Sequence, residues 1–325
     1  MKKVFLIILC SFILILSGCK NQDDKAQSIS TDEYNPSLDG YVSSFLAGAN
    51  TDTTPDDMKP LNMLYMQDNQ IINLECGASG SNPTIVLKVF YDYQAVDFQV
   101  VGEDKYTSEY VFKLEDKTKI NIPIILDSGS IVPDDKIHKV IFAFLTGYDK
   151  NASEFDQVTS EYGLTVIYDV VNTLDYKDEV FIPIQYGATL PDNNFDVNIA
   201  ELIFNIDYEN NIQKTSGGVL NPTPSIATNP DTIFPLMYNF GKESKTSALL
   251  LLTLNFEQIQ IDGQQYKLIE LDGADGTANG QIDITTPKKP GKYEVIGFLV
   301  QNPFEKNTNP SAMVPMSIRF TLNVE

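Results

Sequence analysis

The sequence predicts an all-β protein whose folded part consists of two tandem antiparallel β-sandwich domains. Beyond residue 58 the apolar residues recur at every second position, for example along residues 85–91 and 164–170. This period is typical of strands with one buried face. Turn dipeptides such as Asp262-Gly263 separate the runs, as expected between short strands. No long window has the period of an amphipathic helix, which argues against two-lobed α/β binding proteins.

A third observation, an internal repeat, indicates two similar domains. Three segments of the first half match three segments of the second half in the same order, at offsets of 163, 155 and 154 residues. Colinear matches at such similar offsets indicate a duplication. A weaker match, Met63–Met66 with Ile203–Ile206, places the start of the second copy near residue 178. The three strong matches are residues 85–96 with 248–259, residues 139–145 with 294–300, and residues 164–170 with 318–324.

The N-terminus has the features of an export signal. Two lysines precede an almost unbroken apolar run from Val4 to Leu16, which is too short to span a bilayer but suits the core of a signal peptide. The run ends in Leu16-Ser17-Gly18-Cys19, which resembles the lipobox of bacterial lipoproteins. The resemblance implies that Cys19 carries a diacylglycerol lipid, becomes the mature N-terminus, and anchors the exported protein at the bacterial cell membrane or outer surface.

The segment that follows is predicted to be a stalk. Residues 20–57 are rich in Asp, Ser, Thr, Asn and Gln and contain the breakers Asn35-Pro36 and Thr54-Pro55, a composition typical of flexible linkers. Within it, the apolar patch at residues 41–46 is expected either to dock on the first domain or to form a brief helix.

About seven strands fit each repeat, which is similar to an Ig-like sandwich. The chain lacks the Cys-Trp-Cys core of true Ig domains, since it has no Trp. The predicted organisation is a lipoprotein signal peptide at 1–18, a lipid-anchored flexible stalk at 19–57, and two tandem Ig-like antiparallel β-sandwich domains at 58–175 and 176–325, the second with a long Pro- and Gly-rich loop at 213–231.

The composition disfavours several classes of function. The chain has 44 acidic and 23 basic side chains, a formal charge of −21, which repels phosphate backbones, so we expect no nucleic-acid partner. A single histidine, His138, disfavours His-based metal sites and Ser-His-Asp triads; we interpret it as an edge or turn residue. Cys76, the cysteine left free after processing, is interpreted as a small buried hydrophobe rather than a reactive thiol.

One segment offers a weak calcium site. Residues 272–283 combine glycines with oxygen-bearing side chains, which Ca²⁺ prefers. The segment lacks the spacing and closing Glu of an EF-hand loop, so a Gly- and Asp-rich hairpin between residues 266–271 and 282–284 is the favoured interpretation. The candidate ligands are Asp272, Asp275, Asn279 and Asp283.

No nucleophile elbow, zinc-protease motif, P-loop or dinucleotide fingerprint is present, so we expect no catalytic residues and no cofactor. The sequence favours a non-enzymatic, lipid-anchored cell-envelope protein that serves adhesion, scaffolding or protein binding. Its expected partners are the membrane, through Cys19, and a protein at the envelope. Two alternatives remain: a receptor for a glycan, a small molecule or a Ca-dependent ligand, and an envelope hydrolase with residues on scattered loops. The apolar tail of the signal is also similar to short peptides that some Gram-positive bacteria release as mating pheromones.

Overall fold

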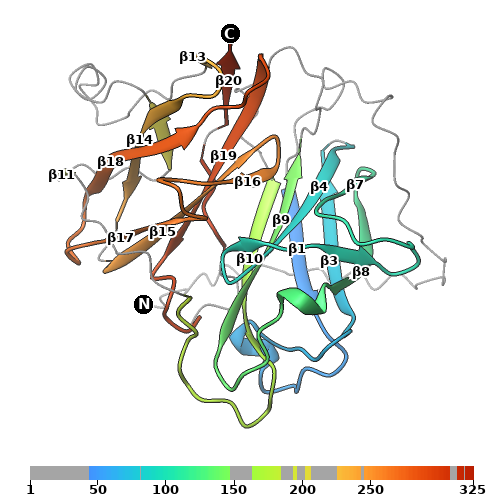
Figure 1. Ribbon diagram of the computed structural model, residues 1–325. Coiled ribbons are helices and arrows are strands. Elements are labelled where there is room, and N and C mark those ends of the chain that lie inside the picture. The colour runs from blue at the N-terminus through green and yellow to red at the C-terminus, as the bar shows by residue number, and fades with distance from the viewer. Residues whose placement is uncertain are drawn as a thin grey trace, which may run out of the picture.

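The computed structural model describes residues 44–80, 82–146, 163–183, 193–195, 202–205, 225–242, 245–307, 313–317 and 319–325 (Figure 1). Within these ranges the chain is built from strands and two short 3-10 helices, η3 (Lys59–Leu61) and η4 (Ser128–Ser130), with no α-helix. The all-β prediction is confirmed. In the same ranges no helix has the length and apolar character needed to cross a membrane.

The first domain is a sandwich of two sheets. One sheet has the order β1-β3-β8-β6, and the other has the order β2-β10-β9-β4-β5, with β7 also paired to β4. This arrangement is that of the A-B-E-D and C-F-G sheets of an Ig-like sandwich. The strands are β1 (Ser44–Asn50), β2 (Met63–Tyr65), β3 (Ile72–Ser79), β4 (Thr84–Tyr91), β5 (Gln94–Ala95), β6 (Phe98–Val100), β7 (Tyr110–Lys113), β8 (Thr118–Leu126), β9 (His138–Thr146) and β10 (Gly163–Val171).

The second domain repeats the order of the six-stranded sheet, as β13-β20-β19-β15-β16 with β17 paired to β15. Its four-stranded sheet has the order β11-β18-β14-β12, in which the edge place of β6 is taken by β11, the first strand of the domain along the chain. The pairing is antiparallel except that β2 runs parallel to β10, and β13 to β20. The strands are β11 (Asn193–Phe195), β12 (Ile203–Asn205), β13 (Ser225–Thr228), β14 (Ile233–Gly241), β15 (Ser247–Leu254), β16 (Glu257–Ile259), β17 (Lys267–Glu270), β18 (Thr277–Thr285), β19 (Gly291–Gln301) and β20 (Phe320–Val324).

Strand register confirms two of the predicted repeat matches and corrects the third. Tyr91 pairs with Val140 as Leu254 pairs with Val295, which reproduces the offsets of 163 and 155. Lys139 pairs with Asp169, however, whereas its equivalent Glu294 pairs with Thr321. The last strands therefore correspond at an offset of 152 rather than 154. A slip of two residues keeps every side chain on its face, so the alternation could not reveal it.

The weaker match was wrong. β12, which contains Ile203–Asn205, pairs antiparallel with β14, as β1 pairs with β3. The equivalent of β2 is β13, because each runs parallel to the last strand of its domain. β13 lies inside the predicted loop at 213–231, where Ile226 is buried in the domain core. Residues 213–224 lie outside the described ranges.

The predicted stalk ends earlier than expected. β1 (Ser44–Asn50) lies within the predicted stalk at 19–57, yet it pairs with β3 along its whole length. Phe45, Ala47 and Ala49 alternate along it and pack against the core of the first domain. The Ala49 N–H also donates to the Tyr168 hydroxyl at 2.8 Å. The apolar patch at 41–46 thus docks as part of a strand rather than a helix, from Ser44 onward; residues 1–43 lie outside the described ranges.

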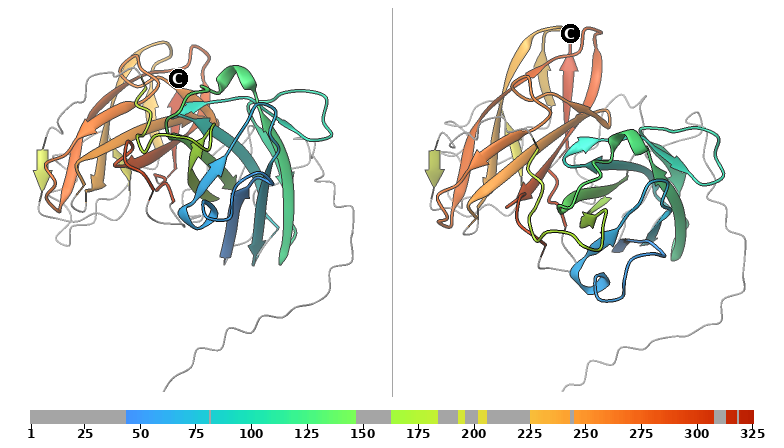
Figure 2. Two further views of the ribbon diagram at one scale, coloured as in Figure 1. Left: turned by 90° about the horizontal axis from the view of Figure 1, so that it is seen from below. Right: turned by 60° about the horizontal axis from the view of Figure 1, so that its bottom comes forward.

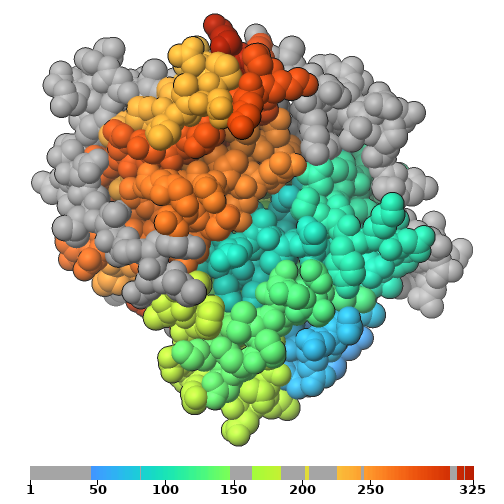
Figure 3. All heavy atoms as spheres, viewed as in Figure 1, coloured from blue at the N-terminus to red at the C-terminus, as the bar shows by residue number. Residues whose placement is uncertain are grey.

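Three large apolar cores organise the described part of the molecule, and a smaller fourth cluster lies where Ile137 contacts Val180 of the segment after β10. Each domain has a core between its two sheets. A third core lies between the domains, where the six-stranded sheets face each other. The two domains lie side by side in every view, and the space-filling view shows them in direct contact (Figures 2 and 3). The members of this inter-domain core are Val86, Phe90, Tyr93, Ile141, Ala143, Leu145 and Ile167 from the first domain, and Leu249, Leu251, Phe256, Tyr266, Leu268, Ile296, Phe298, Val300 and Val314 from the second.

The inter-domain core forms because the central strands are apolar on both faces. Phe90 on β4 and Phe298 on β19 are fully buried, with ring centroids 5.4 Å apart. Polar contacts surround the core: the Gln258 side chain accepts from the Ala95 N–H at 2.6 Å and donates to the Tyr93 carbonyl at 3.0 Å. A strand buried on both faces is expected to be apolar at nearly every position, as residues 85–91 are apart from Lys88, and residues 248–254 apart from Thr253.

Candidate functional site at the domain seam

The four candidate calcium ligands are not brought together. Asp272 accepts hydrogen bonds from the Lys242 ammonium group at 2.5 Å and from the Ala274 N–H at 3.0 Å, and the Lys242 hydrogen bond lowers the pKa of Asp272. Asn279 is fully buried on β18, and Asp283 lies four residues further along the same strand, about 13 Å away at strand spacing. Across the described ranges, no group of three or more His, Cys, Asp or Glu residues could hold a metal ion.

The segment also lacks the predicted hairpin. β17 pairs with β15 in the six-stranded sheet, whereas β18 pairs with β14 in the four-stranded sheet. The intervening loop therefore crosses from one sheet to the other. Asp275 lies in this crossing. The predicted lipid-attachment residue, Cys19, lies outside the described residues.

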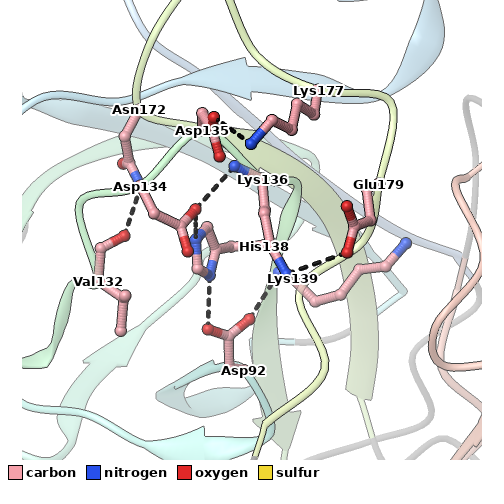
Figure 4. Close-up of polar contacts among 10 residues, drawn as sticks. All are labelled: Asp92, Val132, Asp134, Asp135, Lys136, His138, Lys139, Asn172, Lys177 and Glu179. Atoms are coloured by element: carbon pink, nitrogen blue, oxygen red, sulfur yellow. Dashed lines mark hydrogen bonds and ion pairs between the residues drawn. The ribbon is translucent and has the colours of Figure 1, made fainter.

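His138 is the centre of a polar site that the sequence did not predict. It is the first residue of β9, a central strand between β10 and β4, and its side chain is fully buried. Its Nδ1 lies 2.7 Å from Asp92 Oδ2, and its Nε2 lies 3.0 Å from Asp134 Oδ1 (Figure 4). His138 is thus neither an edge nor a turn residue. We refer to Asp92, His138 and Asp134 as the histidine bridge.

Local backbone structure positions the two carboxylates. Asp92 and Tyr93 have positive φ values of 45° and 68°, as in the two-residue turns that join β-hairpins, and Asp tolerates this conformation better than most residues. Asp92 Oδ1 accepts from the Lys139 N–H at 3.0 Å. Asp134 Oδ1 accepts from the Lys136 N–H at 2.7 Å, which forms a tight turn just before β9.

The histidine bridge requires a charged imidazole. Ionised carboxylates only accept hydrogen bonds, so both ring nitrogens of His138 must carry a proton to satisfy both aspartates. Desolvation by burial opposes this charge, but the hydrogen bonds and charges of Asp92 and Asp134 outweigh it and raise the pKa of His138. The ring also lies between two aromatic rings, Tyr91 at 5.4 Å and Phe181 at 4.8 Å between centroids.

The segment that follows β10 covers His138. We refer to residues 172–183 as the linker, since they lead from the first domain toward the second. Ile137 pairs with the linker through two backbone hydrogen bonds, from Ile137 N–H to the Glu179 carbonyl at 2.9 Å and from Phe181 N–H to the Ile137 carbonyl at 2.7 Å. Two ion pairs reinforce this contact, Lys136–Glu179 at 3.0 Å and Lys177–Asp135 at 2.7 Å (Figure 4).

A pocket of about 440 Å³ opens beside the histidine bridge at the domain seam. The first domain contributes Asp92 and Val132, the linker contributes Phe181 and Pro183, and the second domain contributes Tyr266. We refer to it as the seam pocket. Its wall is mixed: exposed Val132 and half-buried Phe181 are apolar, while Asp92, Gln94 and Ser130 are polar. Such a volume with a few polar groups suits a small ligand or a single side chain of a partner.

A buried ion pair lies close to the seam. The Lys139 ammonium group donates to Asp169 and to the Glu305 carbonyl of the second domain, and the Asn307 N–H donates to Asp169 at 2.8 Å. Burial lowers the pKa of Lys139 and raises the pKa of Asp169. The pair therefore connects the first domain to a loop of the second.

The second domain carries a buried ion pair in which a carboxylate takes the place of Lys139. Glu294, the equivalent of Lys139, contacts Arg319 at 2.8 Å. Asn255 takes the place of Asp92 and accepts from the Glu294 N–H at 2.8 Å. An aspartate there would place a second negative charge beside the buried Glu294, which is unfavourable, so the amide fits the exchanged charge. The equivalent of His138 is Tyr293, so the histidine bridge belongs to the first domain alone.

The site lacks the arrangement of a hydrolytic triad. Nucleophilic catalysis by Ser or Cys needs a hydroxyl or thiol on one nitrogen of the base. Both nitrogens of His138 bond carboxylates instead. The described thiol, Cys76, is buried in the core of the first domain, and burial raises its pKa. In the part of the chain that the structure describes, fold and site together define a two-domain Ig-like β-sandwich protein with a pocket at the domain seam.

Comparison with known proteins adds little to this description. No protein-family model and no curated protein matches the sequence. The structure of WR4, a C. elegans MSP family member, is 18% identical with a TM-score of 0.21, over 31% of this chain and 93% of that chain. The crystal structure of Rst D1-D2 is 11% identical with a TM-score of 0.24, over 85% of this chain and 99% of that chain. At such scores the fold class rests on the strand order of this chain.

Proposed function

We propose that this chain is a non-enzymatic, lipid-anchored binding protein of the bacterial cell envelope, whose two joined Ig-like domains bind a protein partner. The observation that carries the proposal is the seam, where an apolar core joins the domains and leaves a pocket at their junction. Binding of one side chain or loop in such a pocket suits an adhesion or scaffolding protein. Both ring nitrogens of His138 bond carboxylates, which leaves no place for a Ser or Cys nucleophile on this histidine; this favours binding over a hydrolase of the Ser–His or Cys–His type.

The anchoring part of the proposal rests on the lipobox at residues 16–19. From Cys19 to Ser44 the chain has 25 residue steps, which reach at most about 85 Å when fully extended. An anchored chain therefore keeps the first domain close to the bilayer. We expect the Cys19→Ala variant to lose metabolic acyl labelling and to leave the membrane fraction. The Ser17→Thr variant, which leaves the cysteine intact, serves as the control. Membrane retention with intact label in Cys19→Ala would overturn the anchoring.

The binding part can be tested at the seam pocket. Val132 lines the pocket and is 41% exposed, whereas Val101, which is 43% exposed, does not line it. We expect Val132→Lys to abolish cross-linking of the full chain to its partner on intact cells, and Val101→Lys to leave cross-linking unchanged. Equal cross-linking by both variants would place the partner elsewhere. Turnover of glycan or peptide substrates by the purified full chain would contradict the non-enzymatic proposal.

A small-ligand receptor is the second candidate, and the location of the seam pocket specifically favours it. A glycan or small molecule bound between the domains would contact both of them and raise the unfolding temperature of the full chain. A thermal-shift screen of glycans and small molecules against the wild type and Val132→Lys distinguishes the two candidates. A shift seen in the wild type and lost in Val132→Lys favours the receptor, while no shift alongside a Val132-dependent cross-link favours the protein partner.

A further inference from the structure

The histidine bridge connects the only histidine of the chain to the wall of the seam pocket. Asp134 precedes Ile137 by three residues, and Ile137 holds the linker through its two backbone hydrogen bonds to Glu179 and Phe181. Phe181 packs on the His138 ring and lines the pocket. Any change that moves Asp134 or His138 therefore reaches the linker directly, within one layer of side chains.

We propose that the histidine bridge is a pH-responsive contact that holds the linker on the first domain when His138 is protonated and releases it when His138 is neutral. The argument starts from geometry. Two acceptor carboxylates bond opposite nitrogens of one buried ring, and a neutral imidazole has a single N–H. Loss of the proton therefore leaves one carboxylate facing a ring lone pair.

When His138 loses its proton, none of the charged groups described around the ring replaces it as a hydrogen-bond donor to the aspartates. From the β4–β5 turn, Asp92 faces the ring, with the Tyr91 ring stacked on it. From the segment before β9, Asp134 faces it, and the Lys136 ammonium group pairs instead with Glu179. On β9 itself, the neighbouring Lys139 directs its ammonium group to Asp169. From the linker, the apolar Phe181 packs on the ring, Glu179 is engaged by Lys136, and Lys177 pairs with Asp135.

The two aspartates are not equivalent, and this decides which contact is lost. Asp92 is 10% exposed and also accepts from the Lys139 N–H, whereas the Asp134 side chain is 29% exposed. Neutral His138 therefore keeps its proton on Nδ1 for Asp92, and Asp134 turns away into water. The turn that carries Asp134 leads directly into Ile137, so the backbone hydrogen bonds to the linker weaken.

The sign of the pH dependence follows from the direction of the shift. The pKa of His138 is raised above its ordinary value of 6.5. Its contribution to stability is fully present below pH 6.5 and is lost as the pH rises through the raised value. The linker is thus held at pH values below the raised pKa of His138 and released as the pH rises above it.

A single histidine makes the experiment direct. In the full chain in detergent, the one His side-chain NMR signal reports His138 without assignment, and hydrogen exchange reports the linker. We expect a His138 midpoint above 6.5. We also expect amide protection of residues 177–182, corrected for the intrinsic pH dependence of exchange, to fall on the order of tenfold through that midpoint, since a hydrogen bond to a charged group is lost. Unchanged protection across the titration, or a midpoint at or below 6.5, would refute the proposal.

Two matched variants distinguish an effect of the histidine bridge from a general effect of surface charge. In Asp134→Asn, an amide can accept from or donate to either form of the ring, so we expect a lower His138 midpoint and linker protection independent of pH. Asp135→Asn removes the neighbouring carboxylate, whose ion pair with Lys177 also holds the linker; it should lower linker protection equally at every pH and leave the His138 midpoint and the pH-dependent fall in protection as in the wild type. If Asp135→Asn alone moves the linker transition, the Lys177 ion pair is responsible and the proposal fails. The titration of the wild-type chain tests the proposal even if one of the variants misfolds.

Discussion

Replacement of Phe298 by Ala is expected to destabilise both domains, not just the second domain, to which Phe298 belongs. Phe298 belongs to β19 of the second domain but is buried against Phe90 of the first, at 5.4 Å between ring centroids. Replacement of a fully buried Phe by Ala typically costs about 3–5 kcal/mol. Of this, about 0.5–1.5 kcal/mol belongs to the aromatic pair itself. We therefore expect Phe298→Ala to lower the free energy of unfolding by at least about 3 kcal/mol.

The assay is guanidinium unfolding of the full chain, followed by circular dichroism and tyrosine fluorescence, as a double-mutant cycle. Phe90→Ala combined with Phe298→Ala should show a coupling of about 1 kcal/mol. Phe320, which lies in the second domain's own core, provides the control: Phe90→Ala and Phe320→Ala should be additive within about 0.5 kcal/mol. A loss under about 1 kcal/mol for Phe298→Ala, or no coupling to Phe90, would refute a shared inter-domain core.

Three further experiments test structural features of the first domain. Lys139→Met leaves the buried Asp169 unpaired and should cost about 3–5 kcal/mol, most of which the double variant Lys139→Met with Asp169→Leu should recover, measured by chemical unfolding. The Cys76 thiol, buried with a raised pKa, should react with a thiol reagent only after denaturation; rapid reaction of the native chain would contradict its burial. Gly163→Ala should destabilise the chain by more than about 2 kcal/mol, because φ is +115° and a Cβ would lie 1.8 Å from the Phe144 carbonyl. Gly102→Ala is the control, since φ is +101° but the surrounding space is open. In thermal unfolding, Gly102→Ala should lower the midpoint less than Gly163→Ala does.

Much of the fold could be predicted from the sequence because its strands are long and regular. The runs at 85–91 and 139–145 are strands β4 and β9, and their repeats are β15 and β19. β1 was missed because its short sequence, with Gly and Ala among its residues, follows a polar segment and resembles it in composition. Its strand is defined by pairing with β3 and by the contact of Ala49 with Tyr168, 119 residues away, which no local pattern contains.

The sequence contained a signal for the inter-domain core, but it is easily overlooked when the strands are read for the alternation of apolar and polar residues. Residues 85–91 and 248–254 are apolar on nearly every position, not just on one face, and a strand covered on both sides is expected to look so. The histidine bridge had no comparable signal. Asp92 lies 46 residues from His138 in the sequence, and among 44 acidic residues nothing local distinguishes Asp92 and Asp134 as its partners. The four calcium candidates do not converge, because Asp272 and Asp275 lie in the loop that crosses between the sheets while Asn279 and Asp283 lie along β18.

The inter-domain core uses nearly the same positions on both repeats. Val86, Ile141 and Leu145 of the first domain correspond to Leu249, Ile296 and Val300 of the second, and all six lie in the shared core. A surface that meets its own equivalent is the hallmark of an isologous, two-fold interface between identical subunits. The chain therefore resembles a homodimer whose two subunits were joined end to end. Either domain produced alone would expose this self-complementary face, and we expect it to pair with a second copy of itself.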